Sequence, residues 1–370
     1  MRLWIIGNGF DLYHGLKTSY ADYKAFLCQR NTCKLEHNRI KPEQLPREVC
    51  RNCCKDKDTI ENSNCPVRKF NSLPRKNMRK DLWRDVEEAC SFNLDEFLTR
   101  INGWPWDTIE SNGKSAQNPL LHDGLDFAKL FTGTDFIDWL REAKNDLSET
   151  KNSDALRHAI HQDDLFLTFN YTDTPKLYGI PDEHIFYVHG SIGQVENALI
   201  KEKKLDRRLK ESGIVRSFLA FGSPDLTDKA VNAAVDRYAT EKQLCEENTD
   251  QLRHTFSSLA RHLTKDVQSR LKPLKTFVNE HSGDFLSLEE VIVAGHSLGK
   301  IDRPYFNYLT KRFRCAKWRF LFYSSEDMER AVNFCVKHKL DGGCVPWNCA
   351  KESIQGSTHC PGFSIRWSKA

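Results

Sequence analysis

The chain has 370 residues, of which 39% are hydrophobic and 29% charged, so it can bury the core of one large domain or two ordinary ones. With 55 Lys and Arg residues against 51 Asp and Glu residues, the balance requires no polyanionic partner, so nucleic acid is allowed but not indicated. No apolar run approaches the roughly 20 residues of a membrane span, and the first strand leaves no room for a signal peptide, so we expect a cytoplasmic protein without membrane contact.

The first predicted strand covers residues 2–6 and leads into the turn Gly7-Asn8-Gly9. Because glycine has no Cβ, the backbone of such a turn can closely approach a phosphate or a ribose. We expect a helix from Asp11 to about Leu27, whose N-terminal amides would face an anion lodged at the turn. The opening of the chain therefore predicts the ligand site.

A polar segment over residues 28–80 has little hydrophobic periodicity, and we interpret it as an insertion. It holds six of the thirteen cysteines: Cys28, Cys33, Cys50, Cys53, Cys54 and Cys65. The two-residue gap between Cys50 and Cys53 lets two thiolates bind one tetrahedral ion, and Cys65 with Cys33 or His37 would complete a structural zinc site. Free thiols in a reducing compartment are the alternative.

Two apolar strands in the middle of the chain end in polar residues. The strand that starts at residue 164 leads into Asn170 and Asp173, and the strand that starts at residue 185 leads into His189 and Gly190. Ligands of open parallel sheets bind just beyond the carboxyl ends of the strands. An imidazole titrates near neutral pH, which makes His189 the leading catalytic candidate. The alternative for Asn170 and Asp173 is a turn in which they bond to their own backbone.

The other predicted elements complete an α/β pattern. They are helices over 81–101 and 125–147, a strand and turn over 218–224, a charged helical cap over 225–285, strands over 290–294 and 318–323, and a helix over 325–338, before an irregular tail from residue 341. We predict one discontinuous α/β domain over residues 1–370 with a mainly parallel, Rossmann-like sheet.

Two enzyme classes are suggested by short motifs. Gly295-His296-Ser297-Leu298-Gly299 fits the nucleophile elbow of an esterase, with Ser297 as the nucleophile. The order of the triad argues against an esterase, because only His338 and His359 follow that serine. The chain lacks the glycine fingerprint of a dinucleotide-binding dehydrogenase, since Leu12 stands where the third glycine belongs.

The chain resembles the bacterial AbiH family of abortive-infection proteins. The stretches that carry the resemblance are Ile5 to Tyr20, Trp83 to Glu88, Phe169 to Thr174, Val188-His189-Gly190, Gly295 to Leu298, Asp302, and Tyr305-Phe306. The order of the motifs also resembles, more distantly, the sirtuin-like fold of NAD-hydrolysing defence proteins.

The resemblance implies a sirtuin-like sheet that binds NAD⁺, with Asn170 and His189 as catalytic residues and Ser297 as a ribose contact. Thr172 stands where the sirtuin pattern has an aspartate, and Asp173 follows it. The residues implied to hold the nucleotide are Gly7, Asn8, Gly9, Asp11, Thr18, Ser19, Asp173, Gly190, Gly295, Ser297 and Asp302.

The function that the resemblance implies is phage defence by abortive infection, through hydrolysis of the nicotinamide–ribose bond of NAD⁺ or of a related nucleotide. That step needs no metal, so a zinc ion in the insertion would be structural. The alternatives are a nucleotide sensor without catalysis and a ribonuclease, the latter suggested by the basic segments 201–210 and 312–319. A phage-derived trigger and a homo-oligomer are left open.

Overall fold

The computed structural model describes residues 1–30, 95, 133–147, 154–201, 219–220, 226–347 and 365–367. The chain divides into two compact units. The first is formed by Met1–Thr18, Leu140–Ala220 and Asp266–Ala370, and the second by Ser19–Trp139 and Phe221–Lys265. The sheet belongs to the first unit.

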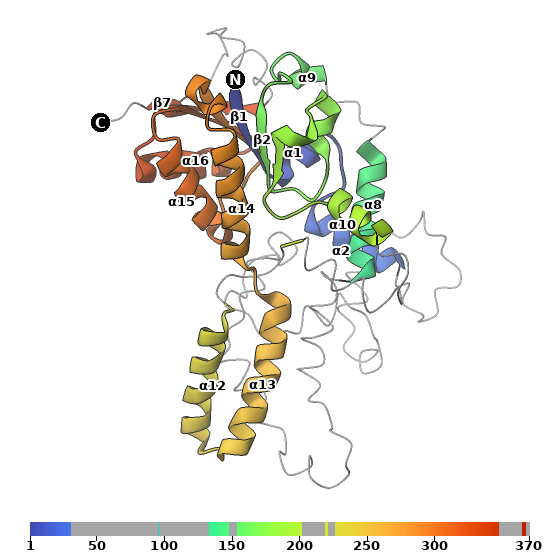
Figure 1. The fold of residues 1–370 in the computed structure, drawn as a ribbon, viewed down its shortest axis with the longest axis vertical. Helices are drawn as coiled ribbons and strands as arrows, with labels where there is room; N and C mark the ends of the chain where they lie inside the picture. Colours follow the sequence, from blue (N-terminus) through green and yellow to red (C-terminus); the bar gives the residue numbers. More distant parts are fainter. Residues whose placement is uncertain are drawn as a thin grey trace. The chain divides into compact units, whose positions relative to one another are not determined.

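A seven-stranded sheet with the order β3-β2-β1-β4-β5-β6-β7 organises the first unit (Figure 1). Its strands are β1 (Arg2–Ile6), β2 (Leu165–Thr168), β3 (Ile185–Tyr187), β4 (Glu290–Ala294), β5 (Lys317–Phe322), β6 (Gly342–Pro346) and β7 (Ile365–Trp367). The first six are parallel, and β7 pairs antiparallel with β6. The chain leaves β1 toward β2 and β3 on one side and returns to β4 on the other, so β1 and β4 flank a topological switch point. The predicted α/β fold with a mainly parallel, Rossmann-like sheet is confirmed.

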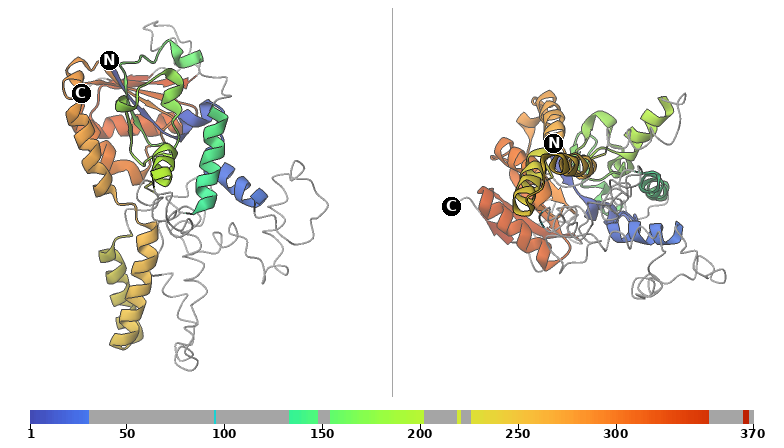
Figure 2. Two further views of the ribbon diagram at one scale, coloured as in Figure 1. Left: turned by 45° about the vertical axis from the view of Figure 1, so that its right-hand side comes forward. Right: turned by 90° about the horizontal axis from the view of Figure 1, so that it is seen from below.

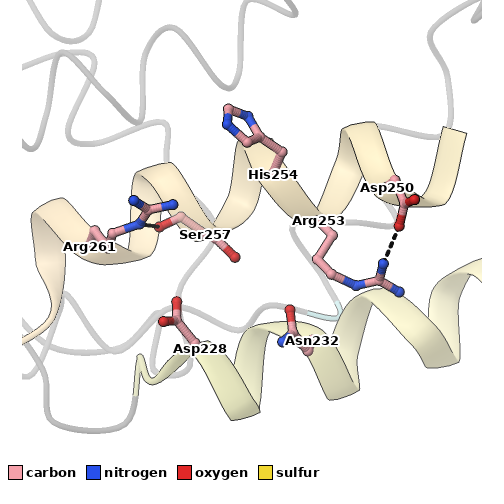
Figure 3. Close-up of a pocket in the computed structure, with 7 residues that line it drawn as sticks. All are labelled: Asp228, Asn232, Asp250, Arg253, His254, Ser257 and Arg261. Carbon is pink, nitrogen blue, oxygen red and sulfur yellow. Dashed lines mark hydrogen bonds and ion pairs between the residues drawn. The ribbon is translucent and has the colours of Figure 1, made fainter. Parts of the chain in front are cut away.

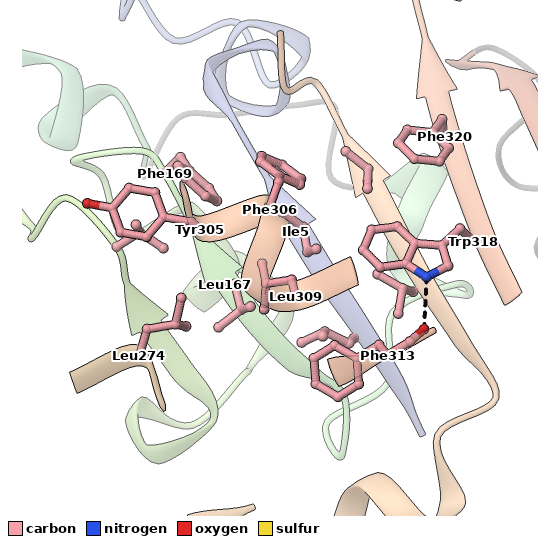
Figure 4. Packing of buried hydrophobic residues seen from close by; sticks show 14 of the residues in the cluster. Ile5, Leu167, Phe169, Leu274, Tyr305, Phe306, Leu309, Phe313, Trp318 and Phe320 are labelled. Atoms are coloured by element: carbon pink, nitrogen blue, oxygen red, sulfur yellow. Dashed lines mark hydrogen bonds between the residues drawn. The ribbon is translucent and has the colours of Figure 1, made fainter. Parts of the chain in front are cut away.

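Both faces of the sheet are buried, as expected for parallel strands covered by helices. Helices α14 (Val267–Glu280), α15 (Arg303–Arg312) and α16 (Ser325–His338), drawn in orange to red in Figure 2, pack against one face of the sheet. On that face Leu3 and Ile5 of β1 join a cluster with side chains of these helices, part of which Figure 4 shows. Trp4 and Ile6 point to the opposite face, where they join a second cluster with α1 (Asn8–Tyr13) and α9 (Asp154–Arg157). The alternation follows from the two-residue period of a strand.

The other α-helices among the described residues are α2 (Tyr20–Arg30), α8 (Thr134–Asp146), α10 (Ile192–Lys201), α12 (Asp228–Lys242) and α13 (Glu246–Leu263). In the second unit, the ring of Tyr23 on α2 packs against the rings of Phe136 and Trp139 on α8. The charged region 225–285 forms α12, α13 and α14, of which α14 belongs to the first unit.

Three predicted elements differ from the structure. The helix expected over residues 11–27 is two helices, α1 and α2, separated where Gly15 adopts a φ of 81°. In the segment 218–224, Leu219 and Ala220 are described and lie outside any strand. The tail expected to be irregular instead supplies β6 and β7.

Some predicted elements lie outside the described residues. These are the insertion beyond residue 30, the helix over 81–101 apart from Asp95, and the part of the helix over 125–147 that precedes residue 133.

Candidate functional site

Polar side chains gather where β1, β2, β3 and β4 end, at the carboxyl edge of the sheet. They form two groups, which we call the Asp11 cluster and the histidine pair. The Asp11 cluster comprises Asp11, Asn170, Thr172 and Thr174. The histidine pair comprises His189 and His296 together with Asp302, whose carboxylate faces both rings.

The carboxylate of Asp11 is fully buried on α1 and is surrounded by donors that follow β2. Its Oδ1 accepts hydrogen bonds from Nδ2 of Asn170 at 2.8 Å and from Oγ1 of Thr174 at 2.6 Å, and its Oδ2 accepts one from Oγ1 of Thr172. Burial raises the pKa of Asp11 to about 6, although the hydrogen bonds from the two threonines and the asparagine act to lower it. Asp11 therefore anchors the polar segment that follows β2.

Asn170 is held in one orientation by this anchor. Its amide nitrogen must face the carboxylate of Asp11, since a carboxylate only accepts hydrogen bonds, so its carbonyl Oδ1 points the other way. Oδ1 is buried and accepts no hydrogen bond within the described part of the chain. A buried carbonyl oxygen of this kind calls for a donor, which a water molecule or a sugar hydroxyl can supply.

The histidine pair lies where β3 and β4 end. Nε2 of His189 is 3.2 Å from Oδ1 of Asp302, and Nε2 of His296 is 3.4 Å from Oδ2 of the same residue. The ring of Phe169 packs edge-on against both imidazoles, with centroid distances of 5.1 Å to His189 and 4.4 Å to His296. Since Phe169 directly precedes Asn170, the two polar groups are linked through consecutive residues of the chain.

His296 was not predicted as a site residue, although it stands in the Gly-x-Ser-x-Gly motif. Its position close behind an apolar strand was the available signal, and the same signal favoured His189.

The two glycine turns of the sequence pack against each other across the switch point. The N–H of Gly7 donates to the carbonyl of Ala294 at 3.0 Å, and the N–H of Gly9 donates to that of Gly295 at 2.8 Å. A Cβ on Gly7 would lie 2.7 Å from Cα of His296, and one on Gly9 would lie 2.7 Å from Cα of Gly295. The absence of a Cβ at these glycines therefore lets the two backbones pack closely. A phosphate would reach their amides only by replacing those two hydrogen bonds.

Three further residues expected to hold the nucleotide also lie near the edge of the sheet. Oδ1 of Asp173 accepts a hydrogen bond of 2.8 Å from the hydroxyl of Tyr187, which joins the segments after β2 and β3. Gly190 turns the chain after β3 with a φ of 81°. Thr18 is buried near Asp11.

The other expected nucleotide contacts are more dispersed. Asn8 is exposed at the first position of α1. Ser19 belongs to the second unit, where its Oγ accepts a hydrogen bond from the N–H of Asp22 and its own N–H donates to that carboxylate, which caps α2.

Ser297 is exposed in an irregular loop, and α15 begins only at Arg303. A nucleophile elbow leads from strand to helix at the serine itself, so this loop does not have the geometry expected of an esterase.

The basic segment 312–319, which suggested a ribonuclease, is partly neutralised by the fold. Arg319 forms an ion pair of 2.8 Å with Glu290 on the adjacent strand β4.

A surface hollow lies between α12 and α13 of the second unit (Figure 3). Its lining residues are Asp228, Asn232, Asp250, Arg253, His254, Ser257 and Arg261. Arg253 is paired with Asp250 and, at 2.8 Å, with Asp236, so the charges in the hollow are largely balanced within the hairpin. No residue expected to bind the nucleotide lies there.

The ligands of the predicted zinc site all lie outside the described residues, since only positions 28–30 of the insertion are described. Within the described ranges, no group of three or more His, Cys, Asp or Glu side chains is arranged to hold a metal ion. None of the helices in the same ranges combines the length and apolar character that crossing a membrane requires.

One comparison with known proteins gives a match. The family model described as "Bacteriophage abortive infection AbiH" matches residues 3–324, which include β1 to β5 and both polar groups at the carboxyl edge. No curated protein and no solved structure gives a match.

Proposed function

The chain belongs to the bacteriophage abortive infection AbiH family, and from this premise we propose that it hydrolyses the nicotinamide–ribose bond of NAD⁺ or the equivalent bond of a related nucleotide. Membership of the family supports a role in phage defence by abortive infection. Loss of NAD⁺ would stop the redox reactions that depend on it and so the growth of the infected cell, which is how such a reaction would serve defence.

The observation that carries the proposal is the convergence of Asn170 and His189 at the carboxyl edge. Asn170 offers a buried carbonyl oxygen that accepts no hydrogen bond from the described residues, and His189 offers an imidazole backed by the carboxylate of Asp302. Cleavage of a bond between a sugar and a base passes through an oxocarbenium-like state, for which a protein must hold the sugar and place a water molecule. These two side chains are suited to both tasks.

The proposed reaction is a displacement by water. Asn170 orients the water or a ribose hydroxyl, and His189 takes a proton from the water as its oxygen bonds to the anomeric carbon of the ribose. The nicotinamide leaves with the electron pair of the broken bond and so becomes neutral, which means that no strong acid is needed. Asp302 stabilises the imidazolium that His189 becomes.

The fit to NAD⁺ concerns the reacting end of the molecule. The amides of Gly7 and Gly9 are occupied by β4 and its turn, so they are not assigned to the diphosphate. No step of the proposed reaction depends on a contact with the diphosphate.

The test is release of nicotinamide from NAD⁺ by the purified full chain, with and without lysate from phage-infected cells. We expect Asn170→Ala and His189→Ala each to lower the rate by about 100-fold or more, as is usual for a general base or the group that orients its water. His281→Ala is the matched control, because His281 contacts Asp284 and the carbonyl of Glu183, which precede β4 and β3 and so lie at the opposite edge of the sheet from the polar groups. Turnover that survives in both site variants would exclude the proposal.

A nucleotide sensor without turnover is the second candidate, and the burial of His189 favours it. Only 3% of this residue is exposed, so a ligand that reached it would displace protein groups. Such a rearrangement on binding is what a conformational switch requires. NAD⁺ that binds the wild-type chain in calorimetry, while no preparation releases nicotinamide, would support the sensor. Cleavage of RNA with salt-dependent affinity would instead support a ribonuclease.

A further inference from the structure

The carboxylate of Asp302 faces two histidines instead of capping the helix that follows it. It is the residue that immediately precedes α15, where an aspartate often accepts a hydrogen bond from an N–H of the first turn, worth about 1 kcal/mol. Its side chain makes no such capping bond. Each carboxylate oxygen instead lies within 3.4 Å of one imidazole, Oδ1 near His189 and Oδ2 near His296.

The backbone determines where the proton of His296 lies. The N–H of Leu298 donates a hydrogen bond of 2.9 Å to Nδ1 of His296, so Nδ1 carries the lone pair and the neutral ring has its proton on Nε2, facing Asp302. Leu298 adopts a φ of 54°, a left-handed conformation that costs a residue with a Cβ about 1 kcal/mol or more. The strain is concentrated at the residue that orients His296.

The same carboxylate determines the tautomer of His189. A lone pair on Nε2, set 3.2 Å from an oxygen of Asp302, would be repelled, whereas an N–H there is attracted. The neutral ring therefore carries its proton on Nε2 and its lone pair on Nδ1.

The geometry points to His296 as a positioning residue that holds Asp302 and thereby keeps His189 in the tautomer whose Nδ1 accepts a proton. Its effect on turnover rests on the proposed function, whereas the tautomer itself does not. The side chains of His189 and His296 are each only 4% exposed, and that of Asp302 is 12% exposed, so water competes little for these contacts.

The test measures the tautomers directly, by ¹⁵N nuclear magnetic resonance on full-length chain labelled at histidine, at a pH where the rings are neutral. His189→Gln and His296→Gln assign the two signals. We expect both rings in the wild type to carry the proton on Nε2. His189 found with its proton on Nδ1 would overturn the inference.

Two variants separate positioning from packing. His296→Phe keeps a ring against Phe169 and Phe306 but removes both nitrogens, so we expect a mixture of His189 tautomers and a fall in kcat of about tenfold or more with little change in KM. His296→Gln can accept from Leu298 and donate to Asp302, and we expect it to restore the tautomer and most of kcat.

Unchanged tautomers and kcat in His296→Phe would contradict the positioning role. If that variant does not fold, Asp302→Asn tests the same role of His296. The Nε2–H of His296 needs an acceptor and so takes the amide oxygen, which leaves the amide N–H facing Nε2 of His189 and shifts the proton of His189 to Nδ1. A tautomer shift in a chain that never releases nicotinamide would leave the inference standing and reject the proposed function.

Discussion

Asn170 donates a hydrogen bond of 2.8 Å to the buried carboxylate of Asp11, which lies 159 residues earlier in the chain. The contact joins the helix that follows β1 to the segment that follows β2, and it turns the carbonyl oxygen of Asn170 away from Asp11. It also places an ionisable group in a site that burial makes unfavourable for a charge, as its pKa of about 6 indicates.

The first prediction concerns the pH dependence of stability. The pKa of Asp11 in the folded chain is about 6, above its ordinary value of 3.8, so its contribution is fully present below pH 3.8 and is lost as the pH rises through 6. At about 1.4 kcal/mol per pH unit between these values, the wild type should lose about 3 kcal/mol relative to Asp11→Asn between pH 4 and pH 7. Urea unfolding of both proteins at the two pH values measures the difference.

The control for this prediction is Asp163→Asn, which removes an exposed carboxyl group two residues before β2 begins and should follow the wild type at both pH values. Parallel pH profiles of the wild type and Asp11→Asn would contradict the prediction.

The second prediction concerns contact between the two glycine turns. Gly295 adopts a φ of 66°, and a Cβ there would lie 2.2 Å from the backbone nitrogen of Phe10. Gly295→Ala should therefore destabilise the fold by about 3 kcal/mol or more, since strain and overlap add. Gly283→Ala is the matched control, because a Cβ there meets nothing within 4 Å, and it should change stability by less than about 1 kcal/mol. Similar melting temperatures for the two variants would disprove the close contact.

The third prediction concerns Asp164, which is buried immediately before β2. It accepts hydrogen bonds from the N–H of Arg2 at 2.8 Å, from the indole of Trp4 at 3.0 Å and from the N–H of His161 at 3.0 Å. Asp164→Ala leaves these donors without their acceptor, so we expect a loss of about 3 kcal/mol in thermal unfolding. Asp163→Ala, at the exposed neighbouring position, should unfold like the wild type, and equal losses would show that the three bonds contribute little.

The fourth prediction separates a ribose contact from a nucleophile at Ser297. If Ser297 holds a ribose hydroxyl, Ser297→Ala should raise KM for NAD⁺ by about three- to tenfold, the effect of one hydrogen bond, and leave kcat unchanged. Hydrolysis of a simple aryl ester by the wild type, abolished in Ser297→Ala, would instead show that Ser297 is the nucleophile of an esterase.

The sequence by itself determined most strands of the parallel sheet, because a strand buried on both faces is a short continuous apolar run. The run Glu290–Ala294 is β4 as predicted, and the amphipathic pattern over 325–338 is α16. The strand Gly342–Pro346 was missed, since its two glycines and proline do not favour a strand, and it forms through pairing with β5. The break at Gly15 was missed because an isolated glycine is compatible with a helix.

The sequence also predicted that Asn170 and His189 lie at one edge of the sheet, because each follows an apolar run and parallel strands bring such positions together. Only the tertiary structure decided that Asp302 joins His189 to His296, that Asp11 anchors Asn170, and that the amides of Gly7 and Gly9 bond to the turn after β4. Local periodicity reflects which face of an element is buried, whereas these contacts, other than that between Asp302 and His296, join segments more than 100 residues apart. They depend on the register and order of the strands, which arise only when the whole sheet packs.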